Sequence, residues 1–405
     1  MTTSLTDDPR FTGLREAAHA LQPNTVALRR LLHRHPEQGL ALPRTQRAVL
    51  DALAGLDLRI TTGRELGSVV AVLDGGKPGP AVLLRGDMDA LPLQEDTDLA
   101  FASEVDGTMH ACGHDTHTAM LASAARLLHE RRAELAGQVV FMFQPGEEGH
   151  HGARFMLEEG LLEAADAPVE KALALHITSK EESGVLRCRR GPIMASANMF
   201  TITVTGRGGH ASMPSDACDP VPAAAAMVGA LQTAVTRRIS VFEPAVLTIA
   251  RITAGTTSNI IPETAELEGT LRALSEETRK TMLEEIRRVC EHVGAAHGCT
   301  VAFDFTPGYP VTVNDDDVAD RVLDLSSAVL GPKHTSVMPN PIMGAEDWSY
   351  VLQRVPGAMA FLGACAPGTT PADAAPNHSN RVVFDEAAFP NGVAVYAAFA
   401  LDALR

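Results

Sequence analysis

The stretch QVVFMFQPGEEG, residues 138–149, decides the fold, because an apolar, β-rich run ends there abruptly in a polar turn. Similar short apolar runs occupy residues 68–73, 81–84 and 172–177. The segment 116–135, which precedes the quoted stretch, has the length and the apolar spacing of a helix. Strands that alternate with helices predict an α/β domain whose sheet is covered on both faces.

On the N-terminal side, residues 14–32 and 45–56 are also predicted to be helical. Near Gly191-Pro192 the pattern changes to β-α-β-β-α-β, the order of a ferredoxin-like unit. Its elements are expected at residues 198–205, 220–238, 246–253, 265–273, 275–297 and 300–306.

After Pro310 the α/β pattern returns, with a strand at 358–362 and a helix after Glu386. A chain of 405 residues favours two domains. We therefore expect a larger domain built from residues 1–191 and 308–405, with a smaller domain, residues 192–307, inserted into it.

The composition excludes several classes of function. The formal net charge of −16 disfavours nucleic acid as a partner, and it offers no basic patch to a membrane surface. The start, MTTSLTDDPR, lacks the features of a signal peptide, and no apolar stretch is long enough to cross a bilayer. Six sparse cysteines indicate reduced thiols in the cytoplasm rather than a disulfide framework. Five are interpreted as buried apolar residues, namely Cys188, Cys218, Cys290, Cys299 and Cys365.

The sixth cysteine lies in the densest cluster of candidate metal ligands, His110-Ala111-Cys112-Gly113-His114-Asp115. Cys112 and His114 are two residues apart, so their side chains share a face in extended backbone. A thiolate and an imidazole together suit zinc and similar metals. The alternative is a buried cysteine beside histidines that cap a helix or lie at the surface.

Adjacent glutamates follow the strand at residues 138–143. Because neighbouring side chains of an extended backbone point to opposite sides, one of Glu147 and Glu148 can bind metal while the other faces a substrate as general base. A solvated acidic turn is the alternative.

Two further candidate sites lie at the ends of predicted strands, and a third lies in a loop. His176 ends one strand, and Asp87 and Asp89 follow another, where they could orient ligating imidazoles. His378 lies in a polar loop. Singly, each has an ordinary alternative: a core histidine, an acidic helix cap or an exposed loop residue. Together, one cysteine, one glutamate and three histidines make a sufficient ligand set for two divalent ions at the edge of an open sheet, namely Cys112, His114, a glutamate of the 147–148 pair, His176 and His378.

With these residues in this order, the chain resembles the M20 metallopeptidase superfamily. The closest branch is the amidohydrolases that include hippurate hydrolases, auxin-conjugate hydrolases and N-acyl-amino-acid deacylases. The resemblance covers nearly the whole chain, from Leu32-His33-Arg34-His35-Pro36-Glu37 to the C-terminal helix. Its markers are Gly86-Asp87-Met88-Asp89-Ala90-Leu91-Pro92, His110-Ala111-Cys112-Gly113-His114-Asp115, Gln144-Pro145-Gly146-Glu147-Glu148-Gly149, Gly209-His210-Ala211-Ser212, Asn259-Ile260-Ile261-Pro262 and Gly344-Ala345-Glu346-Asp347.

The resemblance implies a zinc-exopeptidase-like catalytic domain with an inserted ferredoxin-like lid and dimerisation domain. It implies two divalent metal ions held by Cys112, His114, Glu148, His176 and His378, with Cys112 as the bridging ligand. Glu147 matches the general base, and His210 matches a histidine that stabilises the tetrahedral oxyanion. Asn259 and Arg272 match residues that hold the carbonyl or carboxylate of the substrate. Zinc is the first choice of metal, and manganese, cobalt and nickel suit the same ligands.

The implied reaction is metal-dependent hydrolysis of the amide bond of an N-acyl amino acid, giving a carboxylic acid and an amino acid. A homodimer formed through the inserted domain is expected, in which His210 reaches the active site of the partner subunit. The alternatives are a dipeptidase, an N-acetyl-diaminopimelate-type deacetylase, or a metal-dependent amino-acid-binding protein without activity. Many relatives have glycines at the positions that His150 and His151 occupy in this chain. These two histidines either narrow the substrate pocket or are simply exposed. His33 and Glu37 are either pocket residues or a solvated helix end.

Overall fold

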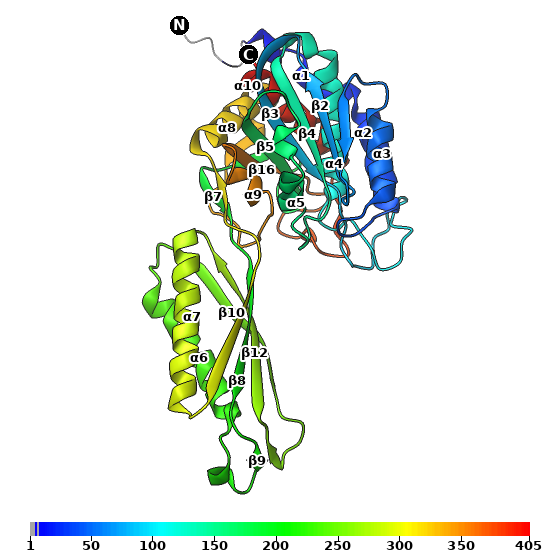
Figure 1. Cartoon of the computed structure of the whole chain (residues 1–405). Helices are drawn as coiled ribbons and strands as arrows, with labels where there is room; N and C mark the ends of the chain where they lie inside the picture. Colours follow the sequence, from blue (N-terminus) through cyan, green and yellow to red (C-terminus); the bar gives the residue numbers. More distant parts are fainter. Residues whose placement is uncertain (1–4, 6–7) are drawn as a thin grey trace. The chain divides into compact units, whose positions relative to one another are not determined.

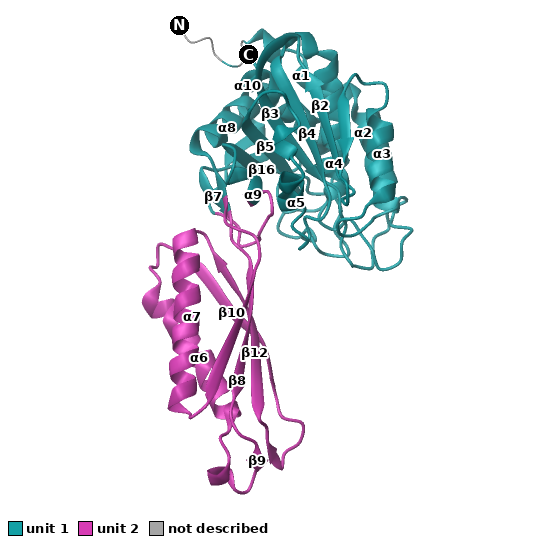
Figure 2. Ribbon diagram, in the orientation of Figure 1, with its two compact units in different colours: residues 1–193, 313–340, 350–405 teal, residues 194–312, 341–349 magenta. Residues whose placement is uncertain are grey.

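The computed structural model describes residue 5 and residues 8–405. Residues 1–4 and 6–7, part of the stretch in which the sequence indicates no signal peptide, lie outside the described residues. The chain divides into two compact units, coloured separately in Figure 2. Unit 1 comprises the described residues up to Ile193, Val313–Asn340 and Tyr350–Arg405, and unit 2 comprises Met194–Thr312 and Pro341–Ser349.

Unit 1 is built on a mixed eight-stranded sheet (Figure 1). In spatial order its strands are β1 (Arg59–Thr62), β2 (Val69–Asp74), β4 (Ala136–Gln144), β3 (Lys77–Asp87), β5 (Val169–Thr178), β16 (Gly357–Gly363), β6 (Leu186–Cys188) and β15 (Thr335–Val337). The four central strands, β4, β3, β5 and β16, are mutually parallel. Their carboxyl ends therefore meet at one edge of the sheet, the usual place for a site in an open α/β fold. The large α/β sheet predicted from the sequence is confirmed.

Helices cover this sheet because its central strands are apolar on both faces. The helices of unit 1 are α1 (Leu14–Ala20), α2 (Gln22–Arg34), α3 (Pro43–Leu53), α4 (His114–Glu130), α5 (Gly152–Glu158), α8 (Asp316–Leu330) and α10 (Phe389–Ala403). Its 3₁₀ helices are η2 (Pro9–Phe11), η3 (Arg132–Glu134), η4 (Leu161–Glu163), η6 (Pro332–His334) and η7 (Glu386–Ala388). Along the described residues, no helix combines the length and apolar composition that crossing a membrane requires.

The helical structure predicted for residues 14–32 is confirmed except at Leu21, where the chain forms two helices, α1 and α2, instead of one. Pro23 stands in the first turn of α2, where its missing N–H is not needed. Inside one continuous helix the same proline would remove a hydrogen bond and clash with the preceding turn. The apolar periodicity continues through both helices and therefore does not reveal the break.

Unit 2 has the element order β8-α6-β10-β12-α7-β13, which is the βαββαβ order predicted from the sequence. The sheet order is β10-β12-β8-β13, antiparallel throughout. Helices α6 and α7 pack together and cover one face of it (Figure 1). The elements are β8 (Asn198–Thr205), β9 (Gly209–His210), η5 (Pro214–Asp216), α6 (Pro220–Arg238), β10 (Ala245–Ala254), β11 (Ile260–Ile261), β12 (Thr264–Ala273), α7 (Glu276–Ala296) and β13 (Thr300–Pro307).

Three short elements lie where the chain passes from one unit to the other. These elements are β7 (Gly191–Met194), β14 (Thr312–Asn314), which pairs with β7, and α9 (Ser349–Leu352).

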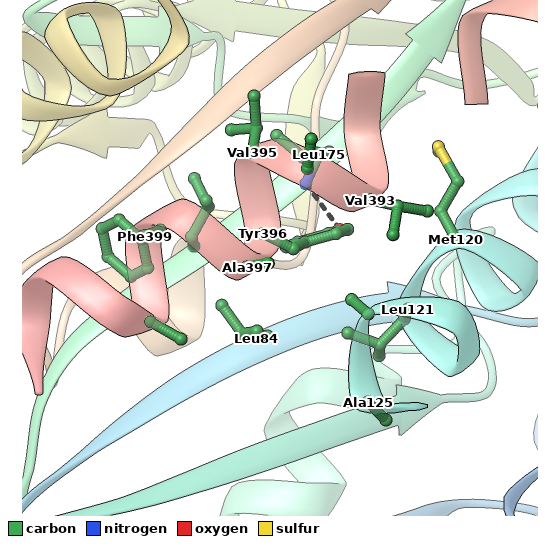
Figure 3. Close-up of a cluster of buried hydrophobic side chains, with 14 of the residues drawn as sticks. Leu84, Met120, Leu121, Ala125, Leu175, Val393, Val395, Tyr396, Ala397 and Phe399 are labelled. Carbon is green, nitrogen blue, oxygen red and sulfur yellow. Dashed lines mark hydrogen bonds between the residues drawn. The ribbon is translucent and has the colours of Figure 1, made fainter. Parts of the chain in front are cut away.

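Helix α10 is apolar on nearly every side and lies buried between other elements of unit 1. Its Tyr396 is fully buried and connects two central strands, as Figure 3 shows in part. The Tyr396 hydroxyl donates to the carbonyl of Arg85 on β3 at 2.6 Å. It accepts from the N–H of Leu175 on β5 at 3.0 Å. One hydroxyl thus satisfies two backbone groups that have no access to water.

We expect Tyr396→Phe to lower the free energy of unfolding of unit 1 by about 1–3 kcal/mol, because it leaves a buried donor and a buried acceptor without a partner. Denaturant unfolding followed by circular dichroism measures the loss. Tyr350→Phe is the control, since Tyr350 is only partly buried and water can replace its hydroxyl. Equal losses for the two variants would contradict the importance of the buried bridge.

Candidate metal centre

Five predicted ligands lie in unit 1, close to the carboxyl edge of the central strands. Cys112 and His114 belong to the segment that leads into α4, and His114 is the first residue of that helix. Glu148 follows β4, His176 lies near the end of β5, and His378 lies in the loop after β16. Parallel strands therefore bring residues far apart in the sequence to one place.

The ligand atoms of these five residues lie close together. The Cys112 Sγ is 3.4 Å from the His176 Nε2 and 3.3 Å from the His378 Nε2. The Glu148 Oε1 is 3.3 Å from the His378 Nε2 and 3.9 Å from the His114 Nε2. Cys112 with His114 and His176 forms one potential metal-binding group, and Cys112 with Glu148 and His378 forms a second. Cys112 is the shared member, as a ligand between two ions must be.

Backbone carbonyls fix which nitrogen of each histidine faces the centre. The Nδ1–H of His114 donates to the carbonyl of Asp89 at 2.8 Å, and the Nδ1–H of His176 donates to the carbonyl of Ile177 at 2.7 Å. A carbonyl can only accept, so Nδ1 carries the proton in both rings. In each ring, Nε2 is therefore the nitrogen that faces the centre and can bind a metal there.

Asp89 also holds the turn that carries the two glutamates. Its carboxylate accepts from the backbone N–H groups of Glu147, at 2.9 Å, and Glu148, at 3.0 Å. Its side chain is 1% exposed, so water cannot replace these bonds. The sequence predicts that Asp89 orients an imidazole. Its carbonyl contacts His114 in that way, and its carboxylate contacts the backbone of the glutamate turn.

Asp87 is fully buried among cations and histidines. Its Oδ2 is 2.9 Å from the Arg85 Nη1 and 3.2 Å from the His114 Nε2. Its Oδ1 accepts from the Nδ1–H of His117 at 2.6 Å. Burial opposes ionisation, but Arg85, His114 and His117 lower the pKa of Asp87 well below its usual value. Asp87 is therefore an anion beside the candidate ligands.

His117 is a residue that the sequence analysis missed. The N–H of Ile177 donates to its Nε2 at 2.7 Å, so its Nδ1 carries the proton given to Asp87. His117 thus connects β5 to Asp87. The signal was present in the sequence: His114 and His117 are three residues apart on a helix and share a face.

Several buried polar atoms at the centre fit a cation. The buried His114 Nε2 and Glu148 Oε1 have polar atoms of other candidate residues nearby, the Asp87 Oδ2 at 3.2 Å and the His378 Nε2 at 3.3 Å respectively. Hydrogen bonds to Cys112 and Glu148 raise the pKa of His378 to about 10, and burial lowers the pKa of His176 well below its usual value. A divalent ion bound here would accept electron pairs from these nitrogen and oxygen atoms and would replace the proton on His378. Thiolate, imidazole and carboxylate ligands suit zinc and other borderline metals.

Glu147 lies at the side of this centre. It is 6% exposed, and its Oε2 is 4.0 Å from the His114 Nε2. Its backbone is fixed by Asp89. It belongs to neither of the two groups that share Cys112, but it forms further potential groups with His114 and Glu148 and with Asp87 and Glu346. A carboxylate so placed can exchange a proton with a group bound at the centre.

The chain matches the family model described as peptidase family M20/M25/M40 over residues 83–402. The chain belongs to this peptidase family. It is 38% identical to "Thermostable carboxypeptidase 1" of Saccharolobus solfataricus over 93% of this chain and 94% of that protein. It is 38% identical to "N-acetylcysteine deacetylase" of Bacillus subtilis over 86% of this chain and 90% of that protein.

A solved structure of the same family has a similar fold. It is the Bacillus subtilis YXEP protein, described as a dinuclear metal binding peptidase from the M20 family. The TM-score is 0.83 and the sequence identity 34%, with 95% of this chain and 99% of that chain covered. The resemblance to the M20 superfamily drawn from the sequence motifs is thereby confirmed.

The predicted catalytic residue His210 and the predicted substrate-binding residues Asn259 and Arg272 lie in unit 2, at two separate places. His210 on β9 is exposed and pairs in register with Ile260 on β11, which follows Asn259 directly. The carbonyl of Asn259 accepts from the N–H of Ala211 at 3.1 Å. Arg272 lies near the other end of β12, eight residues beyond Thr264, or about 26 Å along a strand. Within one subunit, Arg272 therefore lies far from His210 and Asn259.

The two histidines that follow the glutamate turn differ from each other. His150 is exposed. His151 is partly buried, its Nδ1 lies 2.9 Å from the Tyr350 hydroxyl, and its φ is +57°. Only one other non-glycine residue in the described chain has positive φ, the candidate ligand His378 at +68°. Such backbone strain concentrates at functional sites.

A second buried network supports the start of α4. The Asp115 Oδ2 is 2.8 Å from the Arg29 Nε and 2.8 Å from the His33 Nδ1, and all three side chains are at most 1% exposed. Asp115 follows His114 directly, so this network holds the ligand segment against α2. The solvated helix end considered for His33 is therefore wrong. Glu37 accepts from the backbone N–H of Arg44 and of Thr45 at the start of α3.

We expect Asp89→Ala to weaken metal binding and lower turnover by about ten- to a hundredfold, because it releases the backbone of Glu147 and Glu148. Metal content after dialysis against a weak chelator, together with initial rates, measures both effects. Asp96→Ala is the matched control, since that carboxylate is 57% exposed and pairs with Arg381. Full metal content and full rate in Asp89→Ala would show that the turn needs no such anchor.

Proposed function

We propose that this protein is a two-metal amidohydrolase that cleaves the amide bond of N-acyl amino acids. The observation that carries the proposal is the position of Glu147, a buried carboxylate 4.0 Å from the candidate ligand His114 and adjacent in sequence to the candidate ligand Glu148. A protein that only bound metal and amino acid would not need this residue. Membership of the M20/M25/M40 family supports an enzyme that hydrolyses amides.

Two similar proteins support the same substrate class. One is named a carboxypeptidase and the other an N-acetylcysteine deacetylase. Both names describe cleavage of an amide whose nitrogen belongs to an amino acid with a free carboxylate. We infer that this chain acts on the same unit and releases the amino acid and a carboxylic acid.

The residues proposed to hold the two ions are Cys112, as the bridging ligand, and His114, Glu148, His176 and His378. When bound, the ions would polarise the amide carbonyl and make the attacking water more acidic. Zinc is the metal proposed first, because a thiolate and three imidazoles favour it over magnesium or calcium. Manganese, cobalt and nickel remain alternatives that metal analysis distinguishes.

Glu147 is proposed as the general base and, later in the reaction, the general acid. Its carboxylate would accept a proton from the attacking water and donate it to the departing amine. The hydrogen bond from the backbone N–H of Glu147 to Asp89 keeps the carboxylate in position for both transfers. Asp89 thus serves the base as well as the ligand that follows it.

The substrate itself is proposed to contact side chains of unit 2. An imidazole at His210 and an amide at Asn259 can donate to the oxyanion that develops on the carbonyl. The guanidinium of Arg272 suits a carboxylate, and burial lowers the pKa of Arg272 with no opposing effect from an anion. A homodimer formed through unit 2 would let one substrate contact Arg272 of one subunit and His210 of the other. Reaction in the cytoplasm remains the prediction made from the six free cysteines.

We expect metal-loaded protein to release free amino acid from at least one class of N-acyl amino acid. The panel varies acetyl, benzoyl and long-chain acyl groups over several amino acids and includes dipeptides and N-acetyl-diaminopimelate. Glu147→Gln should retain both ions and lose several orders of magnitude in turnover, because it lacks the base. Glu158→Gln, an exposed change on α5, should keep the wild-type rate.

Preferential cleavage of dipeptides would favour the dipeptidase alternative, which the carboxypeptidase relative supports. Near-normal turnover by Glu147→Gln would overturn the mechanism. Binding of amino acids without any cleavage would favour a binding protein.

We also expect two inactive variants, Glu147→Gln and His210→Ala, to regain activity when their subunits mix. A hybrid dimer has one site with an intact Glu147 and the intact His210 of the partner subunit. Native mass spectrometry measures subunit exchange, and initial rates measure the recovery. Each variant incubated alone is the control. Proven exchange without recovered activity would mean that His210 serves its own subunit or none.

A further inference from the structure

Two thiols lie against each other in unit 2, although the sequence gives no reason to pair them. The Sγ atoms of Cys218 and Cys299 are 3.6 Å apart. Cys299 is 5% exposed, whereas Cys218 is only partly buried, so the sequence interpretation of Cys218 as a buried apolar residue is wrong. Within the described residues, none of the other four cysteines contacts a second thiol, and all four are buried.

Regular elements on both sides hold the two cysteines in place. Cys218 immediately precedes Asp219, the residue that caps the start of α6 with its side chain. Cys299 follows Gly298, whose positive φ ends the turn after α7. The Cys218 thiol donates to the carbonyl of Gly298, with 3.2 Å between sulfur and oxygen. The packing of α6 against α7 brings these two turns together.

We propose that Cys218 and Cys299 form a reversible oxidation site, which a small-molecule disulfide such as oxidised glutathione converts into one intramolecular disulfide. A disulfide requires the sulfurs to approach to about 2.05 Å, so they must move about 1.5 Å closer. Both cysteines adjoin turns rather than lying inside a helix. Rotation of the side chains and a small shift of these turns can provide the movement.

The reaction proceeds by two exchange steps. The Cys218 thiol loses its proton and attacks one sulfur of oxidised glutathione, which releases the first glutathione thiol. Cys299 then loses its proton and attacks the Cys218 sulfur of the mixed disulfide, which releases the second. Burial raises the pKa of the Cys299 thiol to about 11, so Cys218, the more exposed of the two, attacks first. The two cysteines are oxidised by two electrons, and one glutathione disulfide is reduced to two thiols.

The site also lies at the base of the hairpin that carries His210. The N–H of Arg207 donates to the carbonyl of Cys218, and the N–H of Cys218 donates to the carbonyl of Arg207, both at 2.8 Å. These bonds close the segment that contains β9. A shift of Cys218 toward Cys299 therefore moves the base of the hairpin, and a displacement of about 1 Å can cost a catalytic group much of its effect. This consequence rests on the proposed function of His210, whereas the oxidation itself does not.

The test exposes metal-loaded, full-length protein to a series of glutathione redox ratios and then blocks free thiols with iodoacetamide. Trypsin together with a glutamate-specific protease separates Cys290 from Cys299 by cleavage after Glu291. Mass spectrometry is expected to find one pair of peptides joined by a disulfide between Cys218 and Cys299. Treatment with a reductant should cleave this disulfide and separate the peptides. Cys290→Ser, a buried cysteine of α7 without a thiol neighbour, should retain the cross-link, and Cys218→Ser should lose it.

Absence of the cross-link at every ratio would overturn the proposal, as would glutathione that stays attached to Cys218 without transfer. Measurement of kcat provides the second test. Oxidation should lower kcat several-fold in the wild type, dithiothreitol should restore it, and Cys218→Ser should show no such change. A cross-link that leaves kcat unchanged would overturn the connection to His210. An inactive reduced protein would count against amide hydrolysis but would leave the cross-link measurement valid.

Discussion

The two hydrogen-bonding groups of Asp89 connect the parts of unit 1 on which its chemistry depends. The carbonyl fixes the ring of His114 at the start of α4, and the carboxylate holds the backbone of Glu147 and Glu148 after β4. Asp89 itself follows β3, which lies beside β4 in the sheet. One buried residue thus sets a ligand, a base and a second ligand relative to each other. Burial makes this arrangement rigid, because no water can replace the bonds that Asp89 accepts.

Burying so many ionisable groups in one place is costly unless their charges are balanced. Asp87 is balanced by Arg85, and Asp115 by Arg29, so these two carboxylates are satisfied within the protein. The group of Cys112, Glu148 and His378 is different, since its ligand atoms lie within 4.8 Å of one another, although His378 itself is exposed. Two cations at this place would complete the balance, and the outer carboxylates would then orient the ligands.

Unit 2 contributes to the proposed reaction through the two ends of one strand. The geometry of β12 separates Arg272 from His210 and Asn259 by more than the length of a small substrate. The proposed homodimer would bring both ends to one substrate. The dithiol at Cys218 and Cys299 lies at the end that carries His210. Redox chemistry and subunit contact would therefore act on the same hairpin.

The sequence by itself determined the alternation of strands and helices, the βαββαβ order of the inserted segment and the motifs that identify the family. These features depend on periodicity and on residue types close together in the chain, which a single sequence displays. It did not reveal the break at Leu21, the role of His117 or the burial of His33, because a periodic pattern does not say which partner a side chain meets. The contact of Cys218 with Cys299 joins residues 81 positions apart. Only the packing of α6 against α7 brings them together, since contacts between distant segments arise from tertiary structure alone.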